Sequence, residues 1–272
     1  MITANLNEVD KDFIESNNGE ILKIYIDELD FYFKLYLKTG SRKLVVFSNG
    51  ALDITKKQPP VFMRSSWHEE IQANCLFIDD RTIHNNNLKI GWGIGSKERH
   101  YLKDYNKFVN HICTLLDIEK SSLIYYGSSA GGFMSIAMAS ANRGAKAIVN
   151  NPQTYVSRYH EAIVKKLYQQ IFPDKSKKEI IAEYSDRLSL VNIMARNKNV
   201  PEIFYLQNRL CQSDMDNHLT PLWKNMDRYK LNSRKINFTL YNNRRAGHNP
   251  IGKEQTINYI NTVVNNEIKN LF

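Results

Sequence analysis

Short apolar runs alternate with amphipathic stretches from residue 44 onward, and this alternation constrains the fold more than any other feature of the chain. The runs are Leu44–Phe47, Cys75–Ile78, Leu123–Tyr126, Ala147–Val149, Ile203–Leu206 and Ile236–Tyr241. Runs of this kind are typical of strands buried on both faces of a parallel sheet. Because helical patterns lie between several of them, the sequence predicts an α/β fold: a mostly parallel sheet with helices on both faces.

Residues 101–117 and 253–272 have the clearest helical periodicity. In each stretch, apolar residues recur at spacings of three and four, which places them on one face of a helix. These residues are Leu102, Tyr105, Phe108, Val109, Ile112 and Leu116 in the first stretch, and Ile257, Ile260, Val263, Val264, Ile268 and Leu271 in the second. We expect both helices to cover the sheet.

Two segments depart from the alternation. Near the N-terminus, Ile21–Ile26 and Phe31–Leu37 alternate apolar with polar residues on either side of an acidic turn, which predicts antiparallel edge strands. Residues 155–199 have helical patterning that is interrupted by Pro173 and is rich in lysine. We interpret them as a helical cap inserted into a single domain that spans residues 1–272.

Composition narrows the class of protein. The 272 residues are 42% hydrophobic and 24% charged, so the chain can bury a full core and the disordered and small disulfide-rich classes are excluded. No apolar run approaches the roughly 18 to 20 residues that span a bilayer, and residues 1–10 lack the pattern of a signal peptide. The three cysteines, Cys75, Cys113 and Cys211, form no CxxC pair, so neither a disulfide framework nor a metal site is expected. We expect a cytoplasmic protein, which at most lies at the inner face of the membrane.

The pentapeptide at 127–131 reads Gly-Ser-Ser-Ala-Gly and matches the motif G-x-S-x-G. A strand candidate precedes it and a helix rich in small residues follows, which is the context of a nucleophile elbow centred on Ser129. The backbone N–H of Ala130, at the helix N-terminus, is expected to stabilise an oxyanion. A second donor is expected after the first core strand, from Gly50 or Ala51. A tight turn without reactivity is the alternative interpretation.

A serine nucleophile needs an acid and a base, which follow the serine in this order in the α/β-hydrolase arrangement. His248 is the favoured base among seven histidines because it follows the last strand candidate and precedes the final helix. The acid is expected in the loop 207–218, which follows the penultimate strand candidate. Asp214 is favoured there and Asp216 is the alternate. The aspartate that is not the acid could simply cap the helix that starts near His218.

Other functional motifs are incomplete. The stretch 91–95 lacks the third glycine of a dinucleotide fingerprint, and the glycines at 127–132 are not followed by the Lys-Ser/Thr of a phosphate-binding loop. The lysines at 175–178 lack interleaved aromatic residues, so nucleic acid is not an expected partner. The sequence therefore indicates no permanently bound cofactor and no metal, and any residues that bind a cofactor stay unknown.

Positive charge is concentrated in the C-terminal half of the chain. The net charge is +9, and residues 151–272 hold 19 basic against 11 acidic residues. Such an excess is typical of a solvated surface, or of one that faces nucleic acid, anionic lipid or an anionic substrate.

The chain resembles the serine α/β-hydrolase superfamily, and within it a bacterial group with capsular polysaccharide O-acetyltransferases and the glycan O-acetylating component of accessory secretion systems. The resemblance covers about residues 40–272 and rests on Val-Val-Phe-Ser at 45–48, Tyr-Gly-Ser-Ser-Ala-Gly-Gly at 126–132, Asn-Asn-Pro-Gln at 150–153 and Gly-His at 247–248. It implies Ser129 as the acyl-accepting nucleophile, His248 as the base and an aspartate in the loop 207–218. In such proteins the acid follows the strand closely, where this chain has Cys211.

The resemblance implies an acyltransferase that O-acetylates a bacterial capsular or surface polysaccharide through a Ser-His-Asp triad and an acyl-enzyme. Acetyl-CoA is the expected co-substrate, an anionic glycan or polysaccharide is the expected acceptor, and peripheral association with membrane assembly machinery is a further expectation. An anionic acceptor or the phosphates of CoA would suit the basic C-terminal half. The alternatives are an esterase or other hydrolase of the same fold, and a catalytically silent scaffold that binds glycan or an assembly partner.

Overall fold

The computed structural model describes residues 1–267, which contain one nine-stranded sheet. The strand order is β1-β2-β3-β5-β4-β6-β7-β8-β9. Strand β3 pairs antiparallel with β2 and β5, and all the other pairs are parallel. The mostly parallel sheet with antiparallel pairing toward its N-terminal edge is therefore confirmed. The strands are β1 (Ile2–Asn5), β2 (Ile21–Ile26), β3 (Leu29–Tyr36), β4 (Leu44–Ser48), β5 (Asn74–Ile78), β6 (Leu123–Ser128), β7 (Lys146–Asn150), β8 (Glu202–Asn208) and β9 (Ile236–Tyr241).

Strand β1 is the one strand of the sheet that the sequence pattern does not predict. It has four residues and pairs parallel with β2, with Ile2 opposite Leu22. A strand this short gives too few positions for its alternation to be recognised. Because β1 occupies the outer edge, the two predicted edge strands lie one position further inside the sheet.

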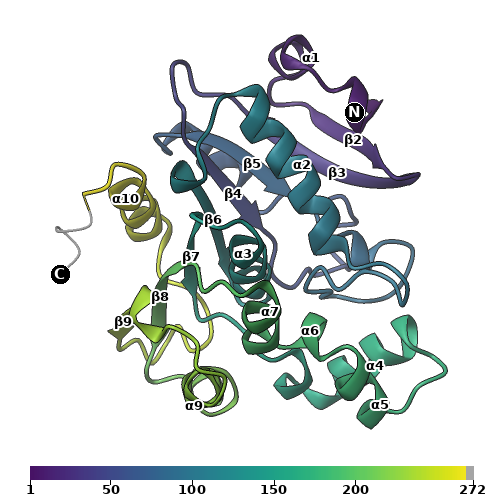
Figure 1. The fold of residues 1–272 in the computed structure, drawn as a ribbon, viewed down its shortest axis with the longest axis vertical. Coiled ribbons are helices and arrows are strands. Elements are labelled where there is room, and N and C mark those ends of the chain that lie inside the picture. The colour runs from purple at the N-terminus through teal and green to yellow at the C-terminus, as the bar shows by residue number, and fades with distance from the viewer. Residues whose placement is uncertain (268–272) are drawn as a thin grey trace.

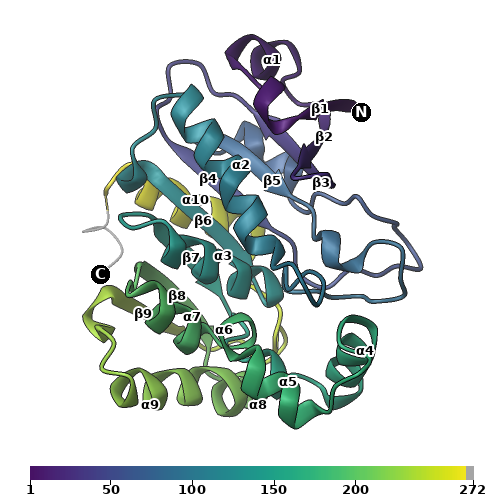
Figure 2. The same ribbon diagram turned by 45° about the vertical axis from the view of Figure 1, so that its right-hand side comes forward.

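Helices cover both faces of the sheet (Figures 1 and 2). Helices α2, α3 and α7 lie on one face and α10 lies on the other. The predicted helix over 101–117 ends at Leu115, and the one predicted over 253–272 ends at Val264; residues 268–272 lie outside the described part of the chain. Within residues 1–267, no helix is both long and apolar enough to cross a membrane. The α-helices are α1 (Lys11–Ser16), α2 (Tyr101–Leu115), α3 (Ala130–Ala141), α4 (Glu161–Ile171), α5 (Lys177–Glu183), α6 (Ser185–Leu188), α7 (Leu190–Asn197), α8 (Gln212–Asp214), α9 (Thr220–Arg228) and α10 (Lys253–Val264).

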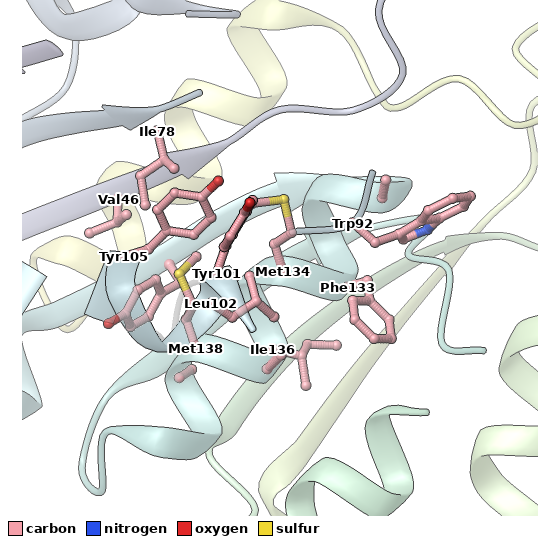
Figure 3. Packing of buried hydrophobic residues seen from close by; sticks show 14 of the residues in the cluster. Val46, Ile78, Trp92, Tyr101, Leu102, Tyr105, Phe133, Met134, Ile136 and Met138 are labelled. Atoms are coloured by element: carbon pink, nitrogen blue, oxygen red, sulfur yellow. The ribbon is translucent and has the colours of Figure 1, made fainter. Parts of the chain in front are cut away.

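Each face of the sheet has its own hydrophobic cluster. On the first face, Tyr105 and Leu102 from α2 pack with Met134 and Phe133 from α3 (Figure 3). On the opposite face, the apolar side of α10 packs on the central strands, and Ile260 is fully buried there. Each fully buried side chain of this size contributes about 1.5 to 3 kcal/mol to the free energy of unfolding. Burial on both faces therefore stabilises β4, β6 and β7 in the centre of the sheet.

The segment 155–199, which we interpret as a cap, contains two kinds of helix. Helix α7 packs against α3 and belongs to the layer on the sheet. Helices α4 and α5 lie outside that layer (Figure 2). We therefore propose that the cap consists of residues 156–188, and that α7 is the crossover helix between β7 and β8.

The turn from β6 into α3 depends on a close approach between backbones. A Cβ atom at Gly131 would lie 2.5 Å from the carbonyl oxygen of Ser48, at the end of β4. A Cβ atom at Gly127 would lie 2.2 Å from the carbonyl oxygen of Gly131. Carbon atoms are not tolerated at these distances, so both positions require glycine. The turn is thereby held against the loop that follows β4.

Replacing Gly131 with alanine tests this contact. We expect Gly131→Ala to lower the free energy of unfolding by about 2 kcal/mol, because the backbone of β4 or α3 must shift to admit the methyl group. The control is Gly252→Ala, since a Cβ atom at Gly252 has no atom within 4 Å. Urea denaturation of both variants gives the comparison, and equal stability of the two would contradict the close packing.

Candidate active site

Ser129 lies in the turn between β6 and α3 in a strained backbone conformation. Its φ and ψ angles are 55° and −124°, which non-glycine residues rarely adopt. Its N–H donates to the carbonyl of Asn150, and its carbonyl accepts hydrogen bonds from the N–H groups of Gly132 and Gln153. These bonds hold the turn in the conformation that lifts the Ser129 side chain above the end of the sheet.

The structure brings Ser129, His248 and Asp214 into one hydrogen-bonded chain. The Nε2 atom of His248 lies 2.8 Å from the Oγ of Ser129, and its Nδ1 atom lies 2.8 and 2.7 Å from the two carboxylate oxygens of Asp214. An ionised carboxylate only accepts, so Nδ1–H donates to Asp214 and Nε2 accepts from the Ser129 hydroxyl. This tautomer is the one that a general base beside a serine needs.

Two buried asparagines hold the loop that carries His248. The side-chain amide of Asn151, just after β7, donates to the backbone carbonyls of His248 and Asn249 at 3.0 and 3.1 Å. The amide of Asn208, at the end of β8, donates to the carbonyl of Gly247 at 2.8 Å. Both side chains are fully buried. The sequence analysis did not identify these residues as part of the site, although each asparagine stands at or directly after the end of a buried strand.

The carboxylate that reaches His248 belongs to Asp214, which is 4% exposed. Asp216, the alternate, is exposed to solvent and accepts a hydrogen bond from Gln212 at 2.8 Å. Asp214 ends the short helix α8, and a π-helix over Met215–Leu219 follows and runs directly into α9. The acid thus lies further from the strand end than the resemblance implies, on a helical turn rather than directly after β8.

Cys211 lies beside the His248 and Asp214 pair. The ligand atoms of these three residues lie within 4.8 Å of one another, the spacing of a metal site. Two of the three are hydrogen-bonded to each other, and burial raises the pKa of the Cys211 thiol. A protonated thiol is a poor metal ligand, so the arrangement is better suited to proton transfer than to holding a metal.

The expected oxyanion donors, the N–H groups of Ala130 and of Gly50 or Ala51, belong to residues around the turn and stay a prediction. Ala130 is the first residue of α3, and a Cβ atom at Gly50 would lie 3.6 Å from the carbonyl oxygen of Ser128, beside the turn. Ala51, the other candidate, is the next residue and is exposed. Among the hydrogen bonds within residues 1–267, none is donated by the backbone N–H of Ala130, Gly50 or Ala51. These N–H groups can therefore bind a developing oxyanion.

Gln153 is a further contact of Ser129, and it is not among the site residues that the sequence predicts. Its side chain is fully buried, and its Nε2 donates to the Oγ of Ser129 at 3.0 Å. The indole N–H of Trp92 donates to its Oε1 and fixes the orientation of the amide. Tyr159, at the start of the cap segment, packs edge-on against Trp92. The Ser129 oxygen thus accepts from Gln153 while its hydroxyl donates to His248.

A cavity of about 180 Å³ lies on the Asp214 side of the site. His218, which lines it, accepts a hydrogen bond at Nδ1 from the N–H of Thr154, and burial lowers its pKa to about 4. His218 is therefore neutral near pH 7, with its Nε2–H as a donor. The lining residues are Arg158, Tyr159, His160, Ser213, Asp214, Asn217, His218 and His248.

The guanidinium of Arg64 lies beside the turn that carries Ser129. Arg64 donates from Nη2 to the hydroxyl of Ser128 at 2.8 Å, and it lies over the rings of Trp67 and Tyr126. Ser128 immediately precedes the nucleophile candidate. Arginine side chains therefore stand near Ser129 on one side and along the cavity on the other.

Comparison with known proteins identifies similar folds. No family model matches the chain, and no curated protein sequence matches it. The capsule O-acetyltransferase of Neisseria meningitidis serogroup A matches with a TM-score of 0.64 and 14% identity, over 89% of this chain and 96% of that chain. Another structure of that enzyme, with a histidine replaced by alanine, is in complex with CoA.

Two further structures match at similar levels. The Glycosylation Associate Protein complex from Streptococcus agalactiae gives a TM-score of 0.59 and 16% identity, over 91% of this chain and 46% of that chain. Acetyl xylan esterase 1 from Thermoanaerobacterium gives a TM-score of 0.60 and 12% identity, over 88% of this chain and 80% of that chain. At these identities the likeness concerns the fold, and together with the strand order it shows that the chain has an α/β-hydrolase fold.

Proposed function

We propose that this protein is a serine acyltransferase that O-acetylates a bacterial capsular or surface polysaccharide with acetyl-CoA as donor. The observation that carries the proposal is the hydrogen-bonded chain from Ser129 through His248 to Asp214 in an α/β-hydrolase fold. A scaffold without catalytic activity would not need a strained serine in contact with a histidine in the base tautomer.

The first half of the reaction forms an acetyl-enzyme. His248 takes the hydroxyl proton of Ser129 as the oxygen attacks the thioester carbonyl of acetyl-CoA. The N–H of Ala130, with a second donor from Gly50 or Ala51, binds the oxyanion of the tetrahedral intermediate. Collapse of the intermediate breaks the carbon–sulfur bond, and the proton on His248 goes to the CoA thiolate.

The second half transfers the acetyl group. A sugar hydroxyl approaches the acetyl-Ser129 carbonyl, and His248 takes its proton as the new ester bond forms. The same donors bind the second oxyanion, and collapse returns the proton from His248 to the Ser129 oxygen. Asp214 remains ionised throughout and stabilises the protonated imidazole in both halves.

Transfer rather than hydrolysis requires that the acceptor outcompete water at the acetyl-enzyme. Arg158, Tyr159 and His160 come from the start of the cap segment and line the cavity next to His248. The cap thus adds walls to the site that the sheet alone does not supply. The structural similarity to the capsule O-acetyltransferase, which extends over 96% of that chain, also supports the proposal of an acyltransferase.

The polar character of the site favours an anionic acceptor. Arg158 and the Nε2–H of His218 face the cavity, and Arg64 lies near the nucleophile on the other side. Guanidinium groups bind phosphate and carboxylate through paired hydrogen bonds. A glycan with phosphodiester or uronic acid groups fits these donors.

An esterase of the same fold is the second candidate, and one observation favours it. The side chain of His248 is 35% exposed, so water reaches the base directly. One of the similar structures is an acetyl xylan esterase, which also supports this candidate. Acetate release that no glycan suppresses would identify the protein as an esterase.

Acetyl transfer and its dependence on Ser129 can be measured together. We expect the protein to form a stable acetyl adduct or labelled glycan from radioactive acetyl-CoA, and Ser129→Ala to reduce turnover by about 10⁴-fold or more. Anionic oligosaccharides should accept acetyl groups better than a neutral oligosaccharide. Equal labelling of both proteins by a fluorophosphonate would show that Ser129 is not the nucleophile.

The two aspartates of the loop provide a matched pair. Asp214→Asn is expected to lower kcat by about 10² to 10⁴-fold, because the amide favours the wrong tautomer of His248. Asp216→Asn should leave kcat within about twofold, since that carboxylate has no contact with His248. Steady-state kinetics of the two variants give the comparison, and the opposite order would assign the acid to Asp216.

The contact between Gln153 and Ser129 gives a third measurement. We expect Gln153→Ala to lower kcat by about 10- to 100-fold with a smaller change in KM, because Oγ loses a donor that orients it. Trp92→Phe keeps the aromatic packing and removes the N–H that fixes the amide, so its effect should be in the same direction and smaller. An unchanged kcat in Gln153→Ala would show that this hydrogen bond only supports the fold.

A further inference from the structure

An apolar groove lies at the edge of the sheet opposite to β1, away from the site. Its volume is about 370 Å³, and it is lined by Leu219, Thr220, Trp223, Lys224, Phe238 and Leu240. Helix α9 and strand β9, the outermost strand on this side, form its two walls. Trp223 is 45% exposed and Leu240 is 54% exposed, which is unusual for large apolar side chains. We refer to residues 219–245 as the α9–β9 surface.

The α9–β9 surface carries most of the excess positive charge of the protein. Residues 219–245 contain seven lysines and arginines against one acidic residue, a net charge of +6 in a chain whose total is +9. All seven side chains are exposed, and none forms an ion pair within residues 1–267. They are Lys224, Arg228, Lys230, Arg234, Lys235, Arg244 and Arg245.

The basic residues lie around the groove rather than along one side of it. Lys224 lines the groove, and Arg228 is one helical turn further along α9. Arg234 and Lys235 directly precede β9, whereas Arg244 and Arg245 follow its end. Apolar side chains therefore occupy the middle of the surface and cationic ones its ends.

We propose that the α9–β9 surface docks the protein onto a membrane that contains anionic phospholipids. Trp223 and Leu240 would enter the boundary between headgroups and acyl chains, where tryptophan is preferred. The surrounding lysines and arginines would bind lipid phosphates, each strengthening the association about fivefold. The residues that line the groove do not line the cavity beside His248, and the proposal does not depend on the proposed reaction.

Charge and geometry favour a membrane over other occupants. A second copy of the chain would bring two surfaces of net charge +6 together, which is repulsive. Nucleic acid would need open aromatic faces, but Trp223 packs edge-on against Phe238 at 5.3 Å between ring centroids. The seven exposed cations are spread over α9, the turn before β9 and the loop after it, and a fluid layer of anionic headgroups can match charges that are spread in this way.

Vesicle sedimentation tests the proposal. The full chain should bind vesicles that contain about a third phosphatidylglycerol, fail to bind pure phosphatidylcholine, and dissociate as salt rises. The double variant Lys224→Gln/Arg228→Gln should bind at least about 20-fold more weakly. The matched control is Lys177→Gln/Lys178→Gln in α5, which removes two exposed charges from the cap. Equal weakening in both variants would show non-specific attraction and overturn the proposal.

Tryptophan fluorescence tests which face enters the membrane. Of the three tryptophans, Trp92 is fully buried and Trp67 is half-buried, whereas Trp223 is 45% exposed and lies on the α9–β9 surface, so brominated lipid should quench mainly the emission of Trp223. Trp223→Phe should lose most of that quenching while keeping its thermal midpoint. Three results would overturn the proposal: no binding to anionic vesicles, binding of single-stranded DNA or an acidic polypeptide without binding of vesicles, or a dimer that Trp223→Ser disperses.

Discussion

The close backbone contact between the end of β4 and the first turn of α3 determines where the reactive groups lie. With no Cβ at Gly131, α3 starts directly against the carbonyl oxygen of Ser48. The turn before the helix has the strained conformation of Ser129, and the end of β4 lies against it. The candidate nucleophile, the helix N-terminus and the candidate second oxyanion donor thus all lie beside one close backbone contact.

The sequence predicts the parts of this molecule that follow from local periodicity. Each of the six apolar runs from Leu44 onward is a strand. In β4 to β8, burial on both faces selects continuous apolar residues, whereas β9, the outermost strand, is only partly buried. The elbow is recognisable because its glycines and its position between strand and helix are both local features. Strand β1 is not recognisable, since its four residues gain stability only from their pairing with β2.

The supporting residues of the site could not be predicted in the same way. Gln153, Asn151 and Asn208 reach Ser129 and His248 through contacts that join distant parts of the chain. A buried amide is costly unless it is fully hydrogen-bonded, and no local pattern reveals whether its partners exist. The choice between Asp214 and Asp216 similarly depends on which side of a helical turn faces His248, and residues 207–218 give no periodicity long enough to decide it.

The helical segment that begins at Gln212 has a mechanical consequence. Helix α8, the π-helix over Met215–Leu219 and α9 follow one another without a break, so Asp214 stands at one end and the exposed Trp223 about two turns later. A displacement of α9 would therefore shift the backbone that carries Asp214, whose carboxylate is hydrogen-bonded to His248. The wider π turn between them is the natural point of bending, as such turns are at many functional sites. This continuous helical segment thus joins the outer edge of the sheet to the candidate site.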